Sequence, residues 1–170
     1  MLRNSHYCKH IISFSLLVIL SNNVYADQLA NFSSDGCSQF PDGTLTQTDL
    51  WCECCISHDL AYWQGGSQKQ KQQADKTLRD CVLQKTNNKL FANIMYYGVT
   101  VGGLPVFPTW YRWGYGWRYG RGFQSLNLYE QQLVEIRLQH YHLSTPFLAC
   151  EFDYPPRIYL QKQWKKLIAN

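Results

Sequence analysis

The residues with the most chemical potential lie together between positions 52 and 62, in the run CECCISHDLAY. In a helix, residues three and four positions apart share one face. That spacing would bring a thiol, an imidazole, a carboxylate and a phenol to one stripe, from Cys55, His58, Asp59 and Tyr62. An imidazole can act as a general base near neutral pH, and a carboxylate can bind a cation. The stripe therefore combines a candidate base with a candidate metal ligand.

Two helices are expected to position this stripe. Thr46 or Thr48 can cap the start of the first helix, and Gly65 and Gly66 can end it. The second helix follows over residues 67–86, which are rich in good helix formers.

The two-glycine turn between these helices favours an antiparallel pair. Ser67 is the expected N-cap of the second helix, and Asp75 would then face the first helix. A second carboxylate would thus stand opposite the His58 stripe.

The segment before the first helix has the composition of a loop. Residues 31–45, NFSSDGCSQFPDGTL, are dense in turn residues, with Asp35-Gly36 and Pro41-Asp42-Gly43 as turn signals. Such a loop can aim carbonyl and carboxylate oxygens at one point, as calcium sites require. Most loops of this kind bind nothing. The loop becomes a candidate calcium site because Cys37 can tie it to the cysteine-rich helix.

The start of the chain resembles a secretory signal. Basic residues precede a ten-residue apolar core, IISFSLLVIL, which is too short to span a bilayer. We expect residues 1–26 to be removed and residues 27–170 to form a single domain in a secreted or periplasmic protein. The remaining six cysteines would then form up to three disulfides.

The same residues could also indicate other functional classes. Cys52, Cys54, Cys55 and His58 have the identities of zinc ligands, but an exported chain favours disulfides. The sequence has no internal repeat, no P-loop, no dinucleotide fingerprint and no GxSxG motif. Nucleotide-dependent enzymes and serine hydrolases of that type are therefore not indicated.

The helix pair resembles the secreted phospholipase A2 family. That family carries the pattern C-C-x-x-H-D-x-x-Y on one helix, matched by residues 54–62, and D-x5-C on the partner helix, matched by Asp75 and Cys81. A disulfide common in the family is replaced here by Ala61 and Ala74, and the joint loss of both cysteines supports the alignment. The loop DGCSQFPD is similar to the short calcium loop of prokaryotic members.

The resemblance implies a role for each matched residue. His58 is the general base that takes a proton from water, Asp75 orients its imidazole, and Tyr62 supports Asp75. Asp59, Asp35 and the carbonyl of Gly36 are the implied ligands of Ca²⁺. The glycine-rich loop of animal members is missing, which leaves the backbone contacts to calcium and to the oxyanion without a match.

The resemblance also implies a disulfide pattern. Its pairs are Cys37–Cys55 and Cys54–Cys81, and these leave Cys52–Cys150 as the third bridge. The resemblance covers about residues 33–86, while residues 87–170 have no counterpart in the family core. The expected fold is thus mainly α, with two antiparallel disulfide-linked helices of phospholipase A2 type and an aromatic-rich C-terminal extension.

The extension contains an unusual run, TWYRWGYGWRYGRGF, at residues 109–123. Aromatic and basic side chains together suit a lipid–water interface, but they would also suit core packing, sugars or single-stranded nucleic acid. A helix capped by Asn127 and Glu130 is expected over residues 128–140. The candidate membrane contacts are Trp110, Trp113 and Trp117 with Arg112, Arg118 and Arg121.

Charge divides the chain into two halves. Residues 27–81 hold eight acids and four bases, whereas residues 82–170 hold four acids and ten bases. A basic half can meet an anionic surface or can be an ordinary solvated face.

Together with these patterns, the resemblance implies calcium-dependent hydrolysis of the sn-2 ester of phospholipids, with a phospholipid membrane surface as partner and no nucleic acid. The alternative is a catalytically inactive phospholipase-like module that binds lipid or envelope material.

Overall fold

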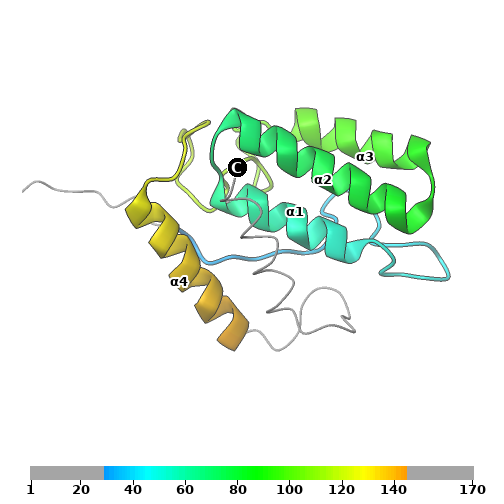
Figure 1. The fold of residues 1–170 in the computed structure, drawn as a ribbon, viewed down its shortest axis with the longest axis horizontal. Coiled ribbons are helices and arrows are strands. Elements are labelled where there is room, and N and C mark those ends of the chain that lie inside the picture. Colours follow the sequence, from blue (N-terminus) through cyan, green and yellow to red (C-terminus); the bar gives the residue numbers. More distant parts are fainter. Residues whose placement is uncertain (1–28, 145–170) are drawn as a thin grey trace, which may run out of the picture.

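A computed structural model defines the fold of residues 29–144 (Figure 1). These residues form four α-helices and no β-strand, which confirms the mainly helical class. The bounds are α1 Cys52–Gln64, α2 Gln68–Thr86, α3 Lys89–Gly102 and α4 Leu128–Ser144. The predicted signal segment, residues 1–26, lies outside the described part of the chain. No helix in the described part is long and apolar enough to cross a bilayer.

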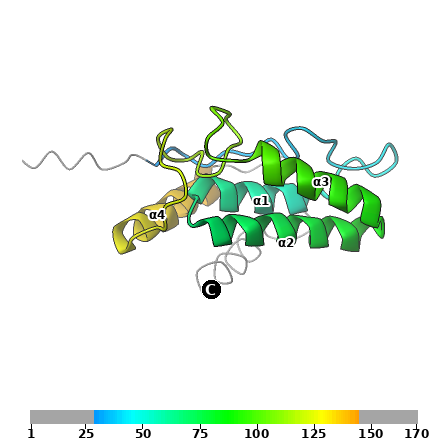
Figure 2. The same cartoon turned by 90° about the horizontal axis from the view of Figure 1, so that it is seen from above.

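The first three helices run side by side (Figures 1 and 2). α2 packs against both α1 and α3, and each connection is a short turn, so successive helices are antiparallel. α4 lies at the end of the molecule where α1 meets α2. Its Val134 and Leu138 enter the core cluster that contains Leu60 and Trp63 of α1.

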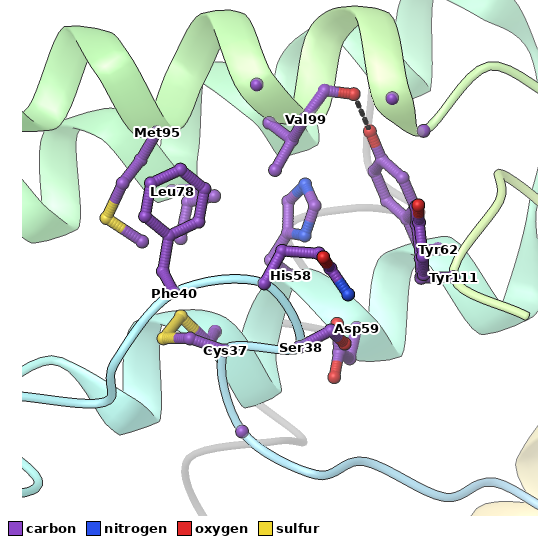
Figure 3. Close-up of a pocket in the computed structure, with 16 residues that line it drawn as sticks. Cys37, Ser38, Phe40, His58, Asp59, Tyr62, Leu78, Met95, Val99 and Tyr111 are labelled. Atoms are coloured by element: carbon purple, nitrogen blue, oxygen red, sulfur yellow. Dashed lines mark hydrogen bonds between the residues drawn. A yellow bond between two sulfur atoms is a disulfide. The ribbon is translucent and has the colours of Figure 1, made fainter.

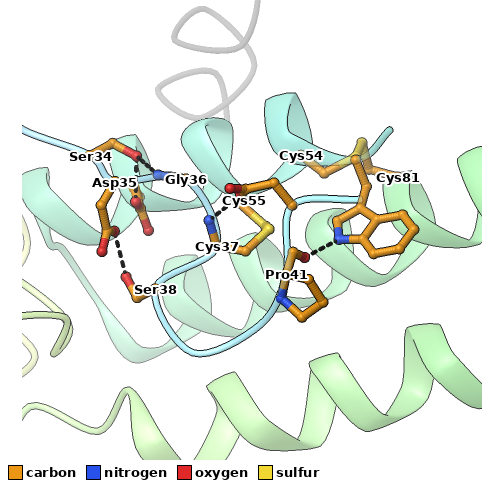
Figure 4. The surroundings of a disulfide bond; sticks show 12 residues. Ser34, Asp35, Gly36, Cys37, Ser38, Pro41, Cys54, Cys55 and Cys81 are labelled. Atoms are coloured by element: carbon orange, nitrogen blue, oxygen red, sulfur yellow. Dashed lines mark hydrogen bonds between the residues drawn. A yellow bond between two sulfur atoms is a disulfide. The ribbon is translucent and has the colours of Figure 1, made fainter. Parts of the chain in front are cut away.

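Two of the expected disulfides are confirmed. Cys54–Cys81 joins α1 to α2, and Cys37–Cys55 joins the preceding loop to α1 (Figure 4). Each such bridge typically contributes roughly 2–4 kcal/mol to stability. Cys52 is also disulfide-bonded, but its predicted partner, Cys150, lies outside the described residues. Because these sulfurs are committed to disulfides, they cannot serve as thiolate ligands of zinc.

The start of α1 differs from the expectation. Its N-cap is Trp51, which makes no side-chain capping bond, so the predicted cap at Thr46 or Thr48 is wrong. Trp51 is held instead by its indole N–H, which donates to the Pro41 carbonyl over 2.7 Å. The helix therefore begins where the loop fixes this buried indole.

The α1–α2 turn follows the sequence closely. Gly65 and Gly66 end α1 with φ values of 68° and 138°, which favour glycine. Ser67 caps α2, and its hydroxyl accepts from the Gln70 backbone N–H in a capping box.

The aromatic run of residues 109–123 contributes Trp113 and Trp117 to the core, so the proposed membrane contact is wrong for these two tryptophans. Trp113 and Trp117 are 1% and 2% exposed. Their indole N–H groups donate to the carbonyls of Gly66 and Gln64 over 2.9 and 2.6 Å. Carbonyls at the C-terminal end of a helix lack partners within it. The two indoles therefore complete the end of α1.

Glycines allow this run to approach α1. The Gly114 N–H donates to the Tyr62 carbonyl over 2.6 Å, and the Gly116 N–H donates to the Trp63 carbonyl over 3.1 Å. A Cβ on Gly116 would collide with the Trp63 indole. Alternating glycine and aromatic residues thus serve backbone contact and core filling together.

The three arginines of the run have different surroundings. Arg112 is buried and donates to the carbonyls of Gly114 and Trp117. Arg121 pairs with Glu130 over 2.8 Å. Of the six proposed membrane contacts, Trp110 and Arg118 are exposed.

The helix over 128–140 is confirmed and extends to Ser144. Its predicted cap is also present, because the Glu130 N–H donates to the Asn127 side chain over 3.0 Å and Glu130 Oε2 accepts from the Asn127 N–H over 2.9 Å. Glu130 thereby links the start of α4 to Arg121.

The Arg121–Glu130 pair predicts pH-dependent stability. The hydrogen bond from Arg121 holds the pKa of Glu130 below its ordinary value of 4.5, and burial opposes this shift. A depressed carboxyl pKa stabilises the fold above the unfolded pKa, and this contribution is lost as pH falls through the folded pKa. Glu130→Gln should cost about 1.5–3 kcal/mol at neutral pH, shrinking below pH 4.5, in urea unfolding at several pH values.

Glu135→Gln, an exposed change on the same helix, is the matched control and should stay within about 0.5 kcal/mol of the parent. A Glu130→Gln deficit that is unchanged at pH 3 would contradict the ion-pair account.

Candidate active site

A pocket of about 170 Å³ lies between α1, α3 and the loop before α1. Figure 3 shows the His58 ring pointing into it between Phe40 and Tyr62. Asp59 and Gly36 line one side, and the apolar lining comes from Phe40, Leu78, Met95, Val99 and Tyr111. The pocket therefore places an imidazole and a carboxylate beside an apolar slot.

Glycines keep the α3 wall of this slot open. Gly98 and Gly102 lie one helical turn apart and both line the pocket. A Cβ on Gly98 would touch the Phe40 ring at 3.5 Å, whereas a Cβ on Gly102 would meet nothing within 4 Å. Neither α3 nor the place of these two glycines in a pocket wall was predicted from the sequence.

His58 and Asp75 meet as expected. His58 Nε2 lies 3.2 Å from Asp75 Oδ1, and both side chains are buried. Because a carboxylate accepts hydrogen bonds, the proton of a neutral imidazole lies on Nε2 and the lone pair on Nδ1. No described residue hydrogen-bonds Nδ1, so this nitrogen is the one available to a molecule in the pocket.

Tyr62 supports Asp75, as the resemblance implied. Its hydroxyl lies 2.7 Å from Asp75 Oδ1 and 3.0 Å from the Val99 carbonyl. Its ring stacks at a tilt against His58, with centroids 4.0 Å apart. Gly103 packs so closely on this ring that a Cβ there would collide with it. Tyr62 thus positions both members of the His58–Asp75 pair.

Two residues near Asp75 were not predicted from the sequence. Lys71 Nζ donates to Asp75 Oδ2 over 2.8 Å, and the Thr100 hydroxyl lies 3.4 Å from the same oxygen. The i,i+4 spacing of Lys71 and Asp75 was a readable signal for the pair. Nothing in that spacing indicates that the lysine is buried.

The electrostatics of the pair suit a base that is neutral at physiological pH. Burial lowers the pKa of His58, and the hydrogen bond and charge of Asp75 oppose this. Burial would raise the pKa of Asp75, but the hydrogen bonds from His58, Lys71 and Tyr62 hold it below its ordinary value. Asp75 is therefore an anion facing a neutral imidazole.

Asp59 lies next to His58 on α1 and turns toward the loop. The Ser34 hydroxyl donates to Asp59 Oδ2 over 2.6 Å. Burial, together with the charges of Asp35 and Asp42, raises the pKa of Asp59 to about 7, and the Ser34 hydrogen bond opposes this. Among the described residues Asp59 forms no ion pair.

The three predicted calcium ligands are only partly brought together. Gly36 lines the pocket beside Asp59, but the Asp35 carboxylate is exposed, accepts from the Ser38 hydroxyl over 2.9 Å and is not part of the lining (Figure 4). Asp42, which was read only as a turn residue, accepts from the Cys37 N–H over 2.6 Å and occupies the space that a Gly36 side chain would need.

This donor set fits a hard cation in its chemistry. Ca²⁺ prefers oxygen ligands, which Asp59 and the loop can provide. A bound cation would also offset the negative charges of two further carboxylates, which lie close enough to Asp59 to raise its pKa. Within the described residues no group of three His, Cys, Asp or Glu side chains is arranged around one point, so backbone carbonyls and Ser34 would have to complete the shell.

Comparison with known proteins adds no family assignment: no family model, no curated protein and no solved structure matches the chain. Inferences about its chemistry therefore rest on the geometry of the pocket and on the resemblance of its motifs.

The support of Asp75 by Tyr62 predicts a measurable loss of stability. Tyr62→Phe keeps the ring but removes a buried hydrogen bond to a carboxylate, which should cost about 1.5–3 kcal/mol in urea unfolding. Tyr97→Phe, at a position 64% exposed on α3, is the control and should change stability by less than about 0.5 kcal/mol. Equal stability of the two variants would show that the Tyr62 hydroxyl contributes nothing.

Proposed function

We propose that this protein hydrolyses the sn-2 ester of phospholipids at a membrane interface in a calcium-dependent reaction. The observation that carries the proposal is the His58–Asp75 pair, which opens onto an apolar pocket beside the Asp59 carboxylate. The resemblance of residues 33–86 to secreted phospholipases A2 supports the same reaction.

In the proposed reaction, Nδ1 of His58 takes a proton from a water molecule as its oxygen attacks the ester carbonyl carbon. Asp75 accepts from Nε2 and stabilises the imidazolium that forms. The imidazolium then returns the proton to the departing alcohol oxygen as the ester C–O bond breaks. The products are a free fatty acid and a lysophospholipid.

The charge that develops on the carbonyl oxygen needs a partner beside His58. A Ca²⁺ ion held by Asp59 with the Gly36 carbonyl, and with Asp35 after movement of its side chain, would supply electrostatic stabilisation of that oxyanion. The raised pKa of Asp59, about 7, supports a cation at this position, because a cation would stabilise the ionised carboxylate.

Exposed apolar residues in the segment next to the pocket support a lipid substrate. We define the mouth rim as Val101, Val106, Phe107 and Trp110, which belong to the same segment, residues 101–111, that contributes Gly102, Gly103 and Tyr111 to the pocket lining. The rim side chains are 40–65% exposed. Exposed apolar groups beside an apolar pocket suit a substrate drawn from a bilayer.

The charge of the surrounding segment suits an anionic membrane. Residues 81–129 contain no Asp or Glu and five Lys or Arg residues. Basic groups near a membrane are attracted by anionic lipid headgroups. We further propose that the protein acts outside the cytoplasm, secreted or periplasmic, which the disulfides of α1 support.

A second function is favoured by one observation. The Asp35 carboxylate is exposed, accepts from the Ser38 hydroxyl and does not line the pocket, which leaves the calcium shell short of one proposed ligand. An inactive phospholipase-like module that binds lipid or envelope material would keep the apolar pocket without turnover. Hydrolysis of vesicle phospholipid separates the two functions.

The proposed reaction predicts release of fatty acid from mixed phospholipid vesicles with calcium and none with chelator. His58→Gln should lower the rate by roughly 10²–10⁴-fold, because it removes the general base, while calcium binding and the fold are retained. If this variant hydrolyses phospholipid as fast as the parent, the binding-module function replaces the enzymatic one.

Two neighbouring variants in the same assay distinguish the roles of the carboxylates. Asp59→Asn should weaken calcium binding in titration calorimetry, and its activity should partly return at high calcium. Asp75→Asn should bind calcium like the parent but react slowly at every calcium concentration. Identical calcium dependence of the two variants would contradict the assigned roles.

The mouth rim predicts a single reporter of membrane contact. Among the five tryptophans that the structure describes, Trp110 is the exposed one, at 60%. Anionic vesicles should shift tryptophan emission to the blue, less at high salt, and Trp110→Phe should remove most of the shift. Tyr129→Phe on α4 is the control, and a full shift in Trp110→Phe would exclude the rim as the contact.

A further inference from the structure

Lys71 is a buried lysine at the junction of three helices. Its side chain comes from α2, and it is 3% exposed. A buried ammonium requires compensation by charge and by hydrogen bonds. Its surroundings therefore indicate what it does.

The Lys71 ammonium has three hydrogen-bond acceptors and three protons to donate. Nζ lies 2.8 Å from Asp75 Oδ2 and 3.2 Å from each of the Val99 and Thr100 carbonyls. It also lies 5.2 Å from the centre of the Tyr62 ring, within the range of a cation–π contact. Every donor of this side chain is thus used.

The carbonyl partners belong to the last turn of α3. Helix C-termini carry partial negative charge and unsatisfied carbonyls, both of which a cation stabilises. The same turn contributes Val99 and Gly102 to the pocket lining. Lys71 therefore connects one wall of the pocket to Asp75.

Asp75 uses its two oxygens for different partners. Oδ1 faces His58 and Tyr62, while Oδ2 faces Lys71 and the Thr100 hydroxyl. Through Oδ2, Lys71 fixes the rotation of the carboxylate and compensates its charge. Both properties determine how Oδ1 meets the imidazole.

We propose that Lys71 is a positioning residue for His58, acting through its ion pair with Asp75 and its anchoring of the end of α3. This inference rests on the proposed function in that His58 is the base it positions. Neither the phospholipase A2 motif nor the sequence pattern assigns a role to this lysine.

The test is a double-mutant cycle on hydrolysis with Lys71→Met, Asp75→Asn and the double variant. Lys71→Met should lower kcat by roughly 10- to 100-fold with little change in KM, a range typical of coupled charged groups. In the Asp75→Asn background the same change should have little further effect, because the group through which Lys71 acts is already altered. An equal loss in both backgrounds would overturn the proposal.

Three further variants test whether the effect belongs to the charge of Lys71. Lys76→Met, an exposed change on the same helix, is the matched control and should keep parental kcat. If Lys71→Met does not fold, Lys71→Gln takes its place in the cycle, because it keeps polar donors but no charge. Lys71→Arg, which restores the charge, should recover most of the kcat, and failure to recover any would overturn the proposal.

A second readout does not need turnover. In proton NMR, the Nε2–H of His58 that faces Asp75 should resonate far downfield in the parent and move further downfield in Lys71→Met, where the carboxylate loses its other partner. An unchanged resonance would overturn the proposal. If the parent releases no fatty acid, the proposed function fails while this measurement still decides whether Lys71 acts on the His58–Asp75 pair.

Discussion

A buried negative charge at Asp75 is the constraint on which the arrangement of the first three helices depends. A carboxylate that is 1% exposed is stable only where donors surround it. His58 and Tyr62 supply them from α1, and Lys71 supplies one from its own helix. α3 joins the network through the Val99 and Thr100 carbonyls, which accept from Lys71. Packing of the three helices and the chemistry of the site therefore share one buried ionic group.

The helix pair and its site residues could be predicted because their signals are local. The i, i+3, i+4 spacing around His58, the glycine pair at 65–66 and the Ser67 cap each act within one or two helical turns. Lys71 belongs to the same helix as Asp75, yet its burial depends on α3 closing over it. Periodicity records which residues share a face, but it does not record which distant segment covers that face.

The aromatic run shows the same limit from the other side. Its composition fits a lipid surface and a core equally well, and the choice depends on unsatisfied carbonyls at the end of α1 that only the folded chain brings near. Trp113 and Trp117 meet those carbonyls, while Trp110, a few residues earlier, does not.

The candidate calcium loop could also be predicted only in part, because turn residues predict a loop but do not fix the direction of each side chain. For this reason the sequence did not indicate the hydrogen bonds of Asp35 with Ser38 and of Asp42 with Cys37.

The completion of α1 by the aromatic run also differs from the α1–α2 contact in the entropy that it costs. The indole bonds to Gly66 and Gln64 join residues 47 and 53 positions apart, whereas α1 and α2 meet through a turn of three residues. Closing a long loop costs more entropy than closing a short one, and nonlocal contacts slow folding. The α1–α2 hairpin is therefore the less costly of the two contacts to close. The Cys54–Cys81 bridge lies within that hairpin, so it restrains the local helix pair, while the long-range contact of the aromatic run depends on hydrogen bonds and packing.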